Sequence, residues 1–282
     1  MSWLADRKAT TTPAVTTTAA RNINFTGALS GTGGFNLDSI DTATAGNQLS
    51  GTLTINNAAS TWSGPLGLTR GTVVFTNVAG GGTLTSYVGY NGAINFNQFG
   101  RVIYRNVDGG TLTRSAALNY AAAAVGELSV DNLGALASNY TVTQSGAVNL
   151  NAGSIMRVSL DAGSALNLTG GVVLNGNASI STQGGTGATN LLTISGTGIS
   201  GTGNLAINDE AGAWAVTSQR IAINAASTFT GNTTLNEGIL ILGHKDALSN
   251  GSLTITAAAS IEAGVDLSAS GSGPVANALN MN

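Results

Sequence analysis

Short runs of alternating apolar and polar residues recur along most of the chain, and glycine, asparagine or aspartate follows each run. Valine, isoleucine or leucine alternates with threonine, asparagine or serine, as in GTLTINNAAS (51–60), GAVNLNAGS (146–154) and NLAINDEAGA (204–213). A period of two places apolar side chains on one face of a β-strand and polar side chains on the other. The pattern therefore predicts an all-β protein whose strands of about five residues are separated by turns.

The strands also repeat at a regular interval. Threonine–apolar–threonine triplets start at Thr52, Thr83, Thr111 and Thr141, and later strands follow at shorter intervals. A nearly constant step of this size is typical of stacked supersecondary units. We expect a parallel β-solenoid of roughly ten coils, with successive coils ~4.8 Å apart. A β-sandwich is the alternative, because it also uses many short strands.

The sequence divides into two parts. Residues 1–21 contain ATTTPAVTTTAAR without alternation and are predicted to form a Thr-rich arm or linker. Residues 22–282 are predicted to form one solenoid repeat domain. Within it, SAALNYAAAAVGEL (115–128) fits either a helical turn or two or a thin solenoid core. In GILIL (238–242), we expect Leu240 and Leu242 to point inward and Ile239 and Ile241 to face the other side.

The composition narrows the possible partners. Of 282 residues, 40 are glycine, none is cysteine and only 8% are charged, against about 25% in typical soluble domains. A net charge of −3 with 10 Lys and Arg residues leaves no basic surface for nucleic acid or for anionic membranes. Without cysteine, disulfides and thiolate metal sites are excluded. No apolar run approaches the ~20 residues of a membrane span, and residues 1–10 lack the apolar core of a signal peptide.

The single histidine, His244, lies between ILILG and ALSNGSLTI, next to Lys245 and Asp246. A catalytic triad needs a nucleophile within hydrogen-bond reach of its base, and a zinc site needs three or four ligands. A lone histidine without thiols or a second histidine meets neither requirement. We therefore predict that His244 occupies a solvated corner.

Three other motifs superficially match known sites. GTGISG (196–201) spells the dinucleotide-binding fingerprint, but a strand rather than a helix is expected to follow it. GGTGATNLL (184–192) resembles a calcium-binding nonapeptide without its aspartate. The close acidic pairs Asp209–Glu210 and Asp38–Asp41 offer too few oxygens for calcium, which takes six to eight. We predict no catalytic, cofactor-binding or metal-binding residues.

The most aromatic region spans residues 87–105. There Arg101 and Arg105 are expected on one side of a strand, with Tyr104 on the opposite side. This region fits a glycan-binding ledge or, as we expect, packing inside a wider coil. Its other aromatic residues are Tyr87, Tyr90, Phe96 and Phe99.

The segment TFTGNTTLNEGILILGHKDALSNGSLTITAAASIEA (228–263) resembles the autotransporter-associated β-strand repeat. The resemblance covers this one repeat. The remaining chain is similar to the family only in its short alternating runs separated by turn residues. It implies a single-stranded, right-handed, extracellular β-helix from the passenger part of a bacterial surface protein. The chain has no leader and no C-terminal barrel, so we expect a fragment of something longer. The matching residues are Phe229, Gly231, Thr233, Thr234, Gly238, Leu240, Leu242, Gly243, Ala247, Leu248, Gly251, Leu253 and Ile255.

These observations favour a non-enzymatic, extracellular structural solenoid that acts as a stalk, adhesin or filament building block. Its expected partner is itself, through end-to-end stacking of terminal coils, or the continuation of a longer chain; glycans are a further candidate. One alternative is a polysaccharide-binding or polysaccharide-cleaving β-helix, which would need carboxylates gathered from different coils. A second alternative is an ice-binding solenoid, in which the outward threonines of the threonine–apolar–threonine triplets would form rows on a flat face.

Overall fold

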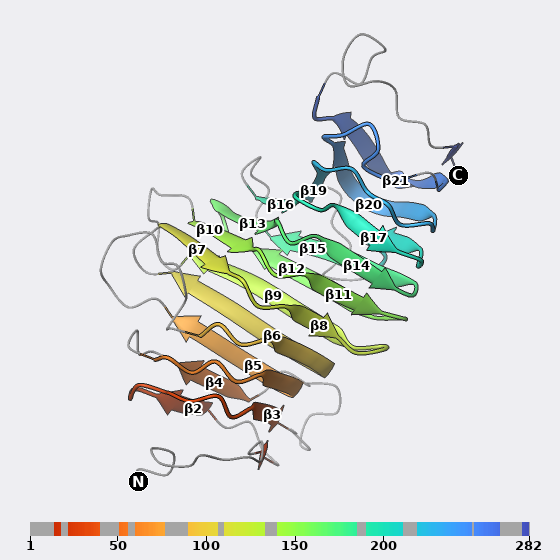
Figure 1. Ribbon diagram of the computed structural model, residues 1–282. Helices are drawn as coiled ribbons and strands as arrows, with labels where there is room; N and C mark the ends of the chain where they lie inside the picture. The colour runs from red at the N-terminus through yellow and green to blue at the C-terminus, as the bar shows by residue number, and fades with distance from the viewer. Residues whose placement is uncertain are drawn as a thin grey trace.

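The computed structural model describes residues 14–17, 22–39, 51–55, 60–76, 90–106, 110–132, 140–184, 190–210, 219–249, 251–265 and 278–281. Within these residues the chain is all-β and forms a parallel β-solenoid, as expected (Figure 1). All the strand pairings are parallel, which excludes a sandwich built from hairpins. The strands are β1 (Ala14–Thr17), β2 (Asn22–Phe25), β3 (Phe35–Ser39), β4 (Thr52–Ile55), β5 (Leu66–Thr76), β6 (Ile94–Asn106), β7 (Gly110–Arg114), β8 (Leu118–Tyr120), β9 (Val125–Asn132), β10 (Tyr140–Gln144), β11 (Val148–Asn151), β12 (Ile155–Leu160), β13 (Ser164–Leu168), β14 (Val172–Asn175), β15 (Ala178–Gly184), β16 (Leu191–Ile194), β17 (Ile199–Gly201), β18 (Leu205–Ile207), β19 (Arg220–Ile223), β20 (Thr233–Leu242), β21 (Leu253–Ala263) and β22 (Leu279–Met281).

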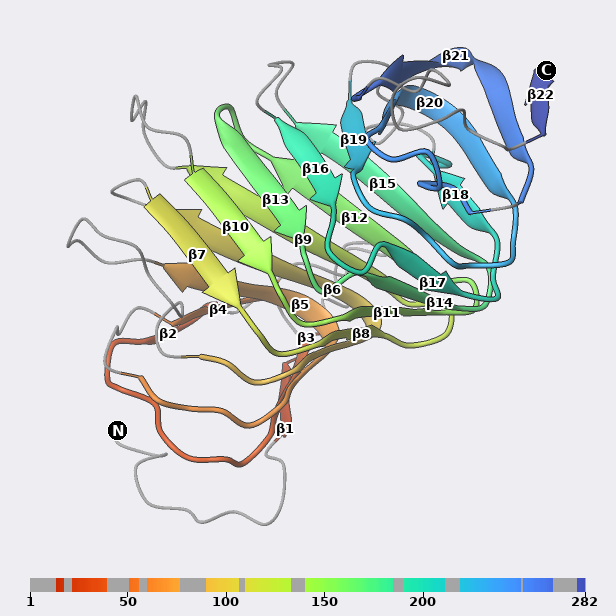
Figure 2. The same cartoon turned by 45° about the horizontal axis from the view of Figure 1, so that its top comes forward.

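The strands stack in three faces around a narrow core (Figure 2). The first face contains β7, β10, β13, β16 and β19, and the second contains β8, β11, β14 and β17. The third face forms the longest ladder, in the order β2, β4, β5, β6, β9, β12, β15, β18, β20, β21 and β22.

The number of turns differs slightly from the expectation. The structure has about seven turns, compared with the roughly ten coils expected. Four strands, β5, β6, β20 and β21, run through a corner and each serve two faces. For example, the first half of β6 pairs with β8 and its second half pairs with β9.

Coil length varies along the solenoid, as the intervals in the sequence indicated. Tyr140 pairs with Gly110 on the preceding coil and with Ser164 on the following coil, so the first of these two coils is the longer. The coil between Thr233 and its partner Leu253 is shorter than either. Most changes in coil length fall in the segments that connect the strands, and the register shifts within a strand pair only in β3–β5, β5–β6 and β20–β21 among the described pairings.

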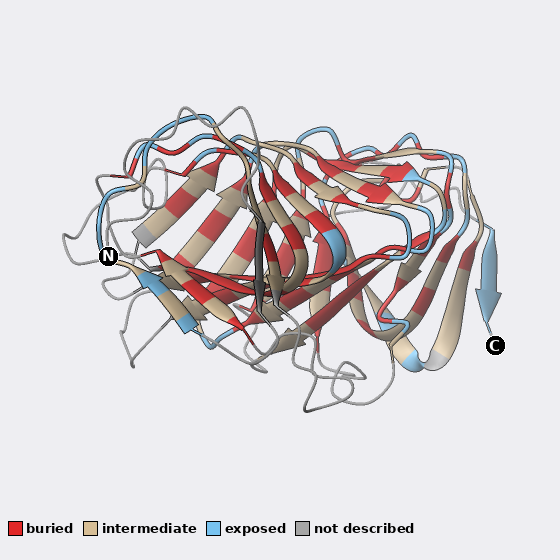
Figure 3. Cartoon of the chain, turned by 90° about the horizontal axis from the view of Figure 1, so that it is seen from below, coloured by how far each residue is buried: buried red, intermediate tan, exposed pale blue. Residues whose placement is uncertain are grey.

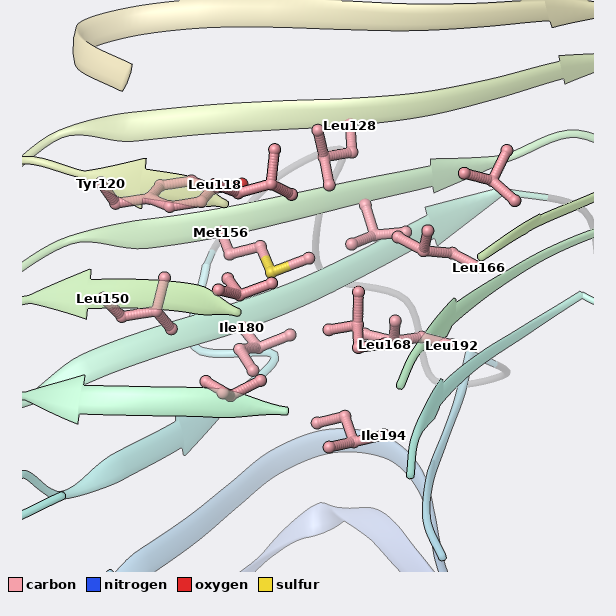
Figure 4. Close-up of a cluster of buried hydrophobic side chains, with 14 of the residues drawn as sticks. Leu118, Tyr120, Leu128, Leu150, Met156, Leu166, Leu168, Ile180, Leu192 and Ile194 are labelled. Carbon is pink, nitrogen blue, oxygen red and sulfur yellow. The ribbon is translucent and has the colours of Figure 1, made fainter. Parts of the chain in front are cut away.

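The core is formed by the inward residues of the alternating strands. Buried and half-buried positions alternate along most strands, as the bands in Figure 3 show. Leu150, Met156, Leu166 and Ile180 come from different faces and meet inside the coils (Figure 4). Burying each such side chain contributes about 1.5–3 kcal/mol.

The segment that allowed two interpretations contains no helix. Residues 115–128 form β8 and the start of β9, with a turn between them. Ala124 in this turn is fully buried, whereas Ala122 and Ala123 are exposed, so only one of these alanines belongs to the core. The expected orientation of the GILIL segment is also confirmed, because Leu240 and Leu242 are buried while Ile239 and Ile241 are half-buried.

One row of corner asparagines caps the backbone of successive coils. The backbone N–H of Asn204 donates to the side-chain oxygen of Asn177 (3.0 Å). Asn232 donates in the same way to Asn204 (2.8 Å), and Ser252 donates to Asn232 (3.0 Å). These bonds satisfy backbone donors at a corner, where the ladder does not supply a partner.

The sheet begins within the segment that was predicted to be an arm. Residues 14–17 form β1, which pairs with β3 from Ala14 opposite Asn36 to Thr17 opposite Ser39. The rest of this segment, residues 1–13 and 18–21, lies outside the described residues.

Candidate functional site

An open groove of about 450 Å³ lies on the outer surface of the third face. Strand register creates it, because outward residues one coil apart stand directly beside one another. One row contains Ile103, Ser129, Ser159 and Gln183. The complete lining is Arg101, Ile103, Glu127, Ser129, Val130, Asp131, Ser159, Asp161 and Gln183.

Two arginines of this region are paired with carboxylates on the next coil. Arg101 Nη2 lies 2.8 Å from Glu127 Oε2, and Arg105 Nε lies 2.8 Å from Asp131 Oδ2. Ser129 Oγ also donates to Glu127 Oε1 (2.9 Å). Much of the charge at the groove is therefore used to join β6 to β9.

The predicted geometry of the arginines is confirmed. Arg101 and Arg105 project from the outer side of β6, and Tyr104 is buried on the inner side. Sequence reasoning missed their partners, although a signal was present. Glu127 and Asp131 have the same spacing along the chain as the two arginines, and each carboxylate follows its arginine by one coil.

Two other ion pairs bridge coils that are not adjacent. Arg157 on β12 binds Glu210, just after β18, so this pair crosses β15. Arg220 on β19 binds Glu262 on β21 and crosses β20. The second pair spans the strand that carries the half-buried outer residues Ile239 and Ile241.

The close acidic pairs of the sequence do not gather into a cation site. Asp209 accepts a hydrogen bond from Asn236 Nδ2 (3.0 Å), while the neighbouring Glu210 pairs with Arg157. Asp38 pairs with Arg70 (2.7 Å), and Asp41 lies outside the described residues. Within the described ranges, no group of three or more histidine or carboxylate side chains is arranged to hold a metal ion.

Most of the aromatic region packs inside the coils, as expected. Tyr90 stacks on Trp62 with ring centroids 4.5 Å apart, and Phe96 stacks on Tyr120 at the same distance. Phe99 is half-buried, and Tyr87 lies outside the described residues.

A fully buried arginine completes this aromatic core. Arg114 Nη1 donates to Tyr104 Oη (2.6 Å), and Nη2 donates to the carbonyl oxygen of Gly92 (2.7 Å). Its guanidinium carbon lies 5.4 Å from the centroid of the Tyr90 ring. Sequence reasoning missed Arg114, although alternation in GTLTR places it on the same face as the buried Leu112.

Burial changes the acidity of two tyrosines in this core. Desolvation raises the pKa of Tyr90 far above its ordinary value, against the opposing positive charge of Arg114. Desolvation also raises the pKa of Tyr120, with a smaller contribution from Tyr104. Both phenols therefore stay neutral at physiological pH.

His244 lies at a corner, in the turn that follows β20, and its side chain is 37% exposed. Its Nδ1 accepts a hydrogen bond from the backbone N–H of Asp246 (3.0 Å). Lys245 Nζ lies 2.5 Å from Asp246 Oδ2. These side-chain contacts stay within residues 244–246, so the imidazole joins no other coil.

The two glycine-rich motifs lie on the solenoid scaffold. Residues 196–198 of GTGISG form a turn before β17, and the next element is the strand β18. Residues 199–210, which directly follow this turn, contain no helix N-terminus to receive a pyrophosphate. Gly184 ends β15, residues 185–189 lie outside the described residues, and Leu191 and Leu192 belong to β16.

The rows of threonine side chains at paired positions on successive coils are short. Thr111 and Thr113 on β7 stand beside Thr141 and Thr143 on β10, but Ala165 and Asn167 occupy the same positions on β13. The triplet at residues 52–54 lies in β4 on a different face, and the triplet at 83–85 lies outside the described residues. A surface that matches ice would need rows of threonine that continue over more coils.

A comparison of the chain with protein-family models, curated proteins and solved structures finds no match. The part of the chain that the structure describes contains no helix that could cross a membrane.

Proposed function

We propose that this chain is a non-catalytic structural solenoid of an extracellular bacterial surface or secreted protein, acting as a stalk, adhesin or filament building block. The observation that supports the proposal is the placement of the charged side chains, which pair between coils. Five arginines of the described residues pair with carboxylates that lie far away in the sequence, on a different coil. Charges placed in this way hold successive coils together.

The fold suits a mechanical role. Backbone hydrogen bonds between coils run along the axis of a β-solenoid. Tension along the axis therefore loads the bonds of all three faces together. Ion pairs such as Arg157–Glu210, which crosses an intervening strand, add links that span more than one interface.

The extracellular placement rests on the resemblance of residues 228–263 to an autotransporter repeat. Several matching residues have packing roles that explain the motif. Phe229, Leu240, Ala247 and Leu248 are buried, and Gly238 has a φ of +81°, a conformation that favours glycine.

The polar groove supports a second candidate, a β-helix that binds or cleaves polysaccharide. The groove gathers Glu127, Asp131 and Asp161 from two neighbouring coils. Carboxylates of this kind bind sugar hydroxyls and act as general acids or bases in glycosidic cleavage. The ion pairs of Glu127 and Asp131 with arginines favour the structural role.

Two measurements test the proposal. Antibodies against the folded chain should label intact cells of the encoding bacterium or its secreted fraction, and labelling confined to the cytosol would contradict the placement. The purified chain should release no reducing ends from a panel of polysaccharides. Cleavage that disappears in Asp131→Asn, but not in the corner control His244→Ala, would establish the enzymatic alternative.

A further inference from the structure

We propose that Asn177 and Asn232 are acceptor sites for N-linked sugars at one exposed corner of the solenoid. Asparagine followed two residues later by serine or threonine, without proline between them, is the acceptor triplet for N-glycosylation. The inference rests on the proposed extracellular function and adds a covalent modification to it. The acceptor triplets of the chain start at Asn24, Asn139, Asn167, Asn177, Asn232 and Asn250.

The position of each triplet in the fold separates these two from the others that the structure describes. Asn177 directly precedes β15 and Asn232 directly precedes β20, so each lies in a turn, and both are exposed. Asn24 lies within β2, and Asn167 lies within β13, where it is half-buried and paired with strands on both sides. The other triplets start outside the described residues. Because N-linked sugars are bulky, a turn accepts them more readily than a strand inside a ladder.

Hydrogen bonding at this corner leaves the acceptor nitrogens available. The side-chain oxygen of Asn177 accepts from the backbone N–H of Asn204 (3.0 Å), and that of Asn232 accepts from the backbone N–H of Ser252 (3.0 Å). Within the described part of the chain, neither Nδ2 donates a hydrogen bond. The oxygen of each amide is thus engaged by the next coil, and the nitrogen remains available to a transferase.

The hydroxyl group of each triplet lies on the outer side of its strand. Ser179 and Thr234 lie two residues after their asparagines, and both are only half-buried. The intervening residues, Ala178 and Thr233, are buried. Alternation therefore directs each hydroxyl-bearing side chain outward, where a transferase can contact it.

The same corner contains a natural control. Asn204 lies between the two acceptors in the row, is also exposed and accepts from the backbone N–H of Asn232 (2.8 Å). Its triplet ends in Ala206, which stands beside Ser179 on one coil and Thr234 on the other. Asn204 therefore has the position of an acceptor without the hydroxyl group.

The backbone of this corner leaves room for a sugar. A glycine precedes each of the three asparagines. A Cβ added at Gly203 or Gly231 would collide with the carbonyl oxygen of the glycine on the preceding coil, so these backbones stack closely. No side chain at the glycine positions crowds the asparagines. Two coil steps place Asn177 and Asn232 about 10 Å apart, with an unmodified coil between their sugars.

The reaction needs a transferase and a sugar that is activated as a phosphate ester at its anomeric carbon. Asparagine Nδ2 attacks the anomeric carbon, and a C–N bond forms as the anomeric C–O bond breaks. The phosphate leaves with the bonding electron pair, and a base of the transferase takes one proton from Nδ2. The bound sugars would hydrate the surface of a chain in which only 8% of the residues are charged.

Peptide mass spectrometry of the natural full-length chain from the encoding bacterium tests the inference. Peptides that contain Asn177 and Asn232 should carry sugar, and the peptide that contains Asn204 should not. Ser179→Ala should remove the sugar from Asn177 alone, whereas Ser179→Thr should keep it. Thr234→Ala and Thr234→Ser are the corresponding pair of variants for Asn232.

Ala206→Ser converts the natural control into an acceptor triplet, so Asn204 should gain sugar in this variant. Circular dichroism checks that each variant is folded. Absence of sugar from both Asn177 and Asn232 in the natural chain would overturn the inference. Sugar that persists in both alanine variants, or no gain at Asn204 in Ala206→Ser, would also overturn it.

These outcomes are separate from those that test the proposed function. An unmodified chain that labels the cell surface and cleaves no polysaccharide would reject the modification alone. Polysaccharide cleavage or a cytosolic location would reject the proposed function.

Discussion

The Arg157–Glu210 ion pair provides a direct test of whether charge holds the coils together. The pair joins β12 to the end of β18 across β15, where Ser181 stands beside Arg157 and is fully buried. We predict that the Arg157→Met and Glu210→Gln substitutions are strongly coupled. Methionine keeps much of the aliphatic packing, and glutamine keeps the shape of the carboxylate side chain.

The geometry sets the expected size of the coupling. Arg157 Nε lies 3.0 Å from both carboxylate oxygens of Glu210, and Nη2 lies 2.5 Å from Oε1. The side chains are only 22% and 12% exposed. Hydrogen bonds to charged groups contribute about 1.5–3 kcal/mol, and exposed pairs about 0.2–1 kcal/mol, so we expect a coupling energy of roughly 1.5 kcal/mol.

A double-mutant cycle from urea unfolding, followed by circular dichroism, measures this energy. Lys245 and Asp246 are the control pair, because they are 44% and 43% exposed and adjacent in one turn. Their coupling should stay below about 0.5 kcal/mol and vanish in about 1 M salt. If the coupling of the bridging pair is no larger than that of the control, the argument for ionic links between coils fails.

Four further changes test other parts of the structure. His244→Ala should change the free energy of unfolding by less than about 0.5 kcal/mol in urea titrations, because the side chain is half-exposed at a corner. Gly198→Ala should cost about 2 kcal/mol or more in the same assay, because Gly198 has a φ of +66° and an added Cβ would collide with the carbonyl oxygen of Ala226. Asn119→Ala should cost about 1–2 kcal/mol, because Asn119 donates to Asn95 (2.8 Å) and accepts from Asn149 (2.7 Å); a smaller loss in thermal melts than in the exposed control Asn280→Ala would contradict this. Burial raises the folded-state pKa of Tyr90 and Tyr120, so their contribution to the free energy of unfolding is fully present below the unfolded pKa of about 10 and is lost as the pH rises above it. Urea unfolding from pH 9 to 11 should therefore show a falling free energy of unfolding, and Tyr90→Phe and Tyr120→Phe should each make that fall smaller.

The candidate site could be predicted only in part from the sequence. Alternation correctly placed Arg101 and Arg105 on the outer side of one strand, because this orientation is a local property of an extended backbone. It did not identify Glu127 and Asp131 as their partners. That pairing depends on the length of the coil at this position, and the next coil along the same ladder is longer.

Buried polar groups were the least predictable feature. Arg114 occupies an inward position that alternation assigns to the core, but its charge argues against burial. Only the folded structure brings Tyr104 Oη and the carbonyl oxygen of Gly92 to its guanidinium group. Both groups come from elements that precede Arg114 in the chain, and no local pattern encodes their approach.

The sequence by itself determined that the protein is all-β, that its strands have one inward face and that glycine and asparagine separate them, whereas parallel stacking was favoured over a sandwich and was settled by the structure. These features follow from the period of two and from the backbone preferences of single residues. The tertiary structure alone decided which outward residues stand side by side, that residues 14–17 join the sheet, and that Arg114 is buried among the aromatic side chains. Register across coils depends on the lengths of all the connecting segments, and these lengths vary from coil to coil without a signal in the strands themselves.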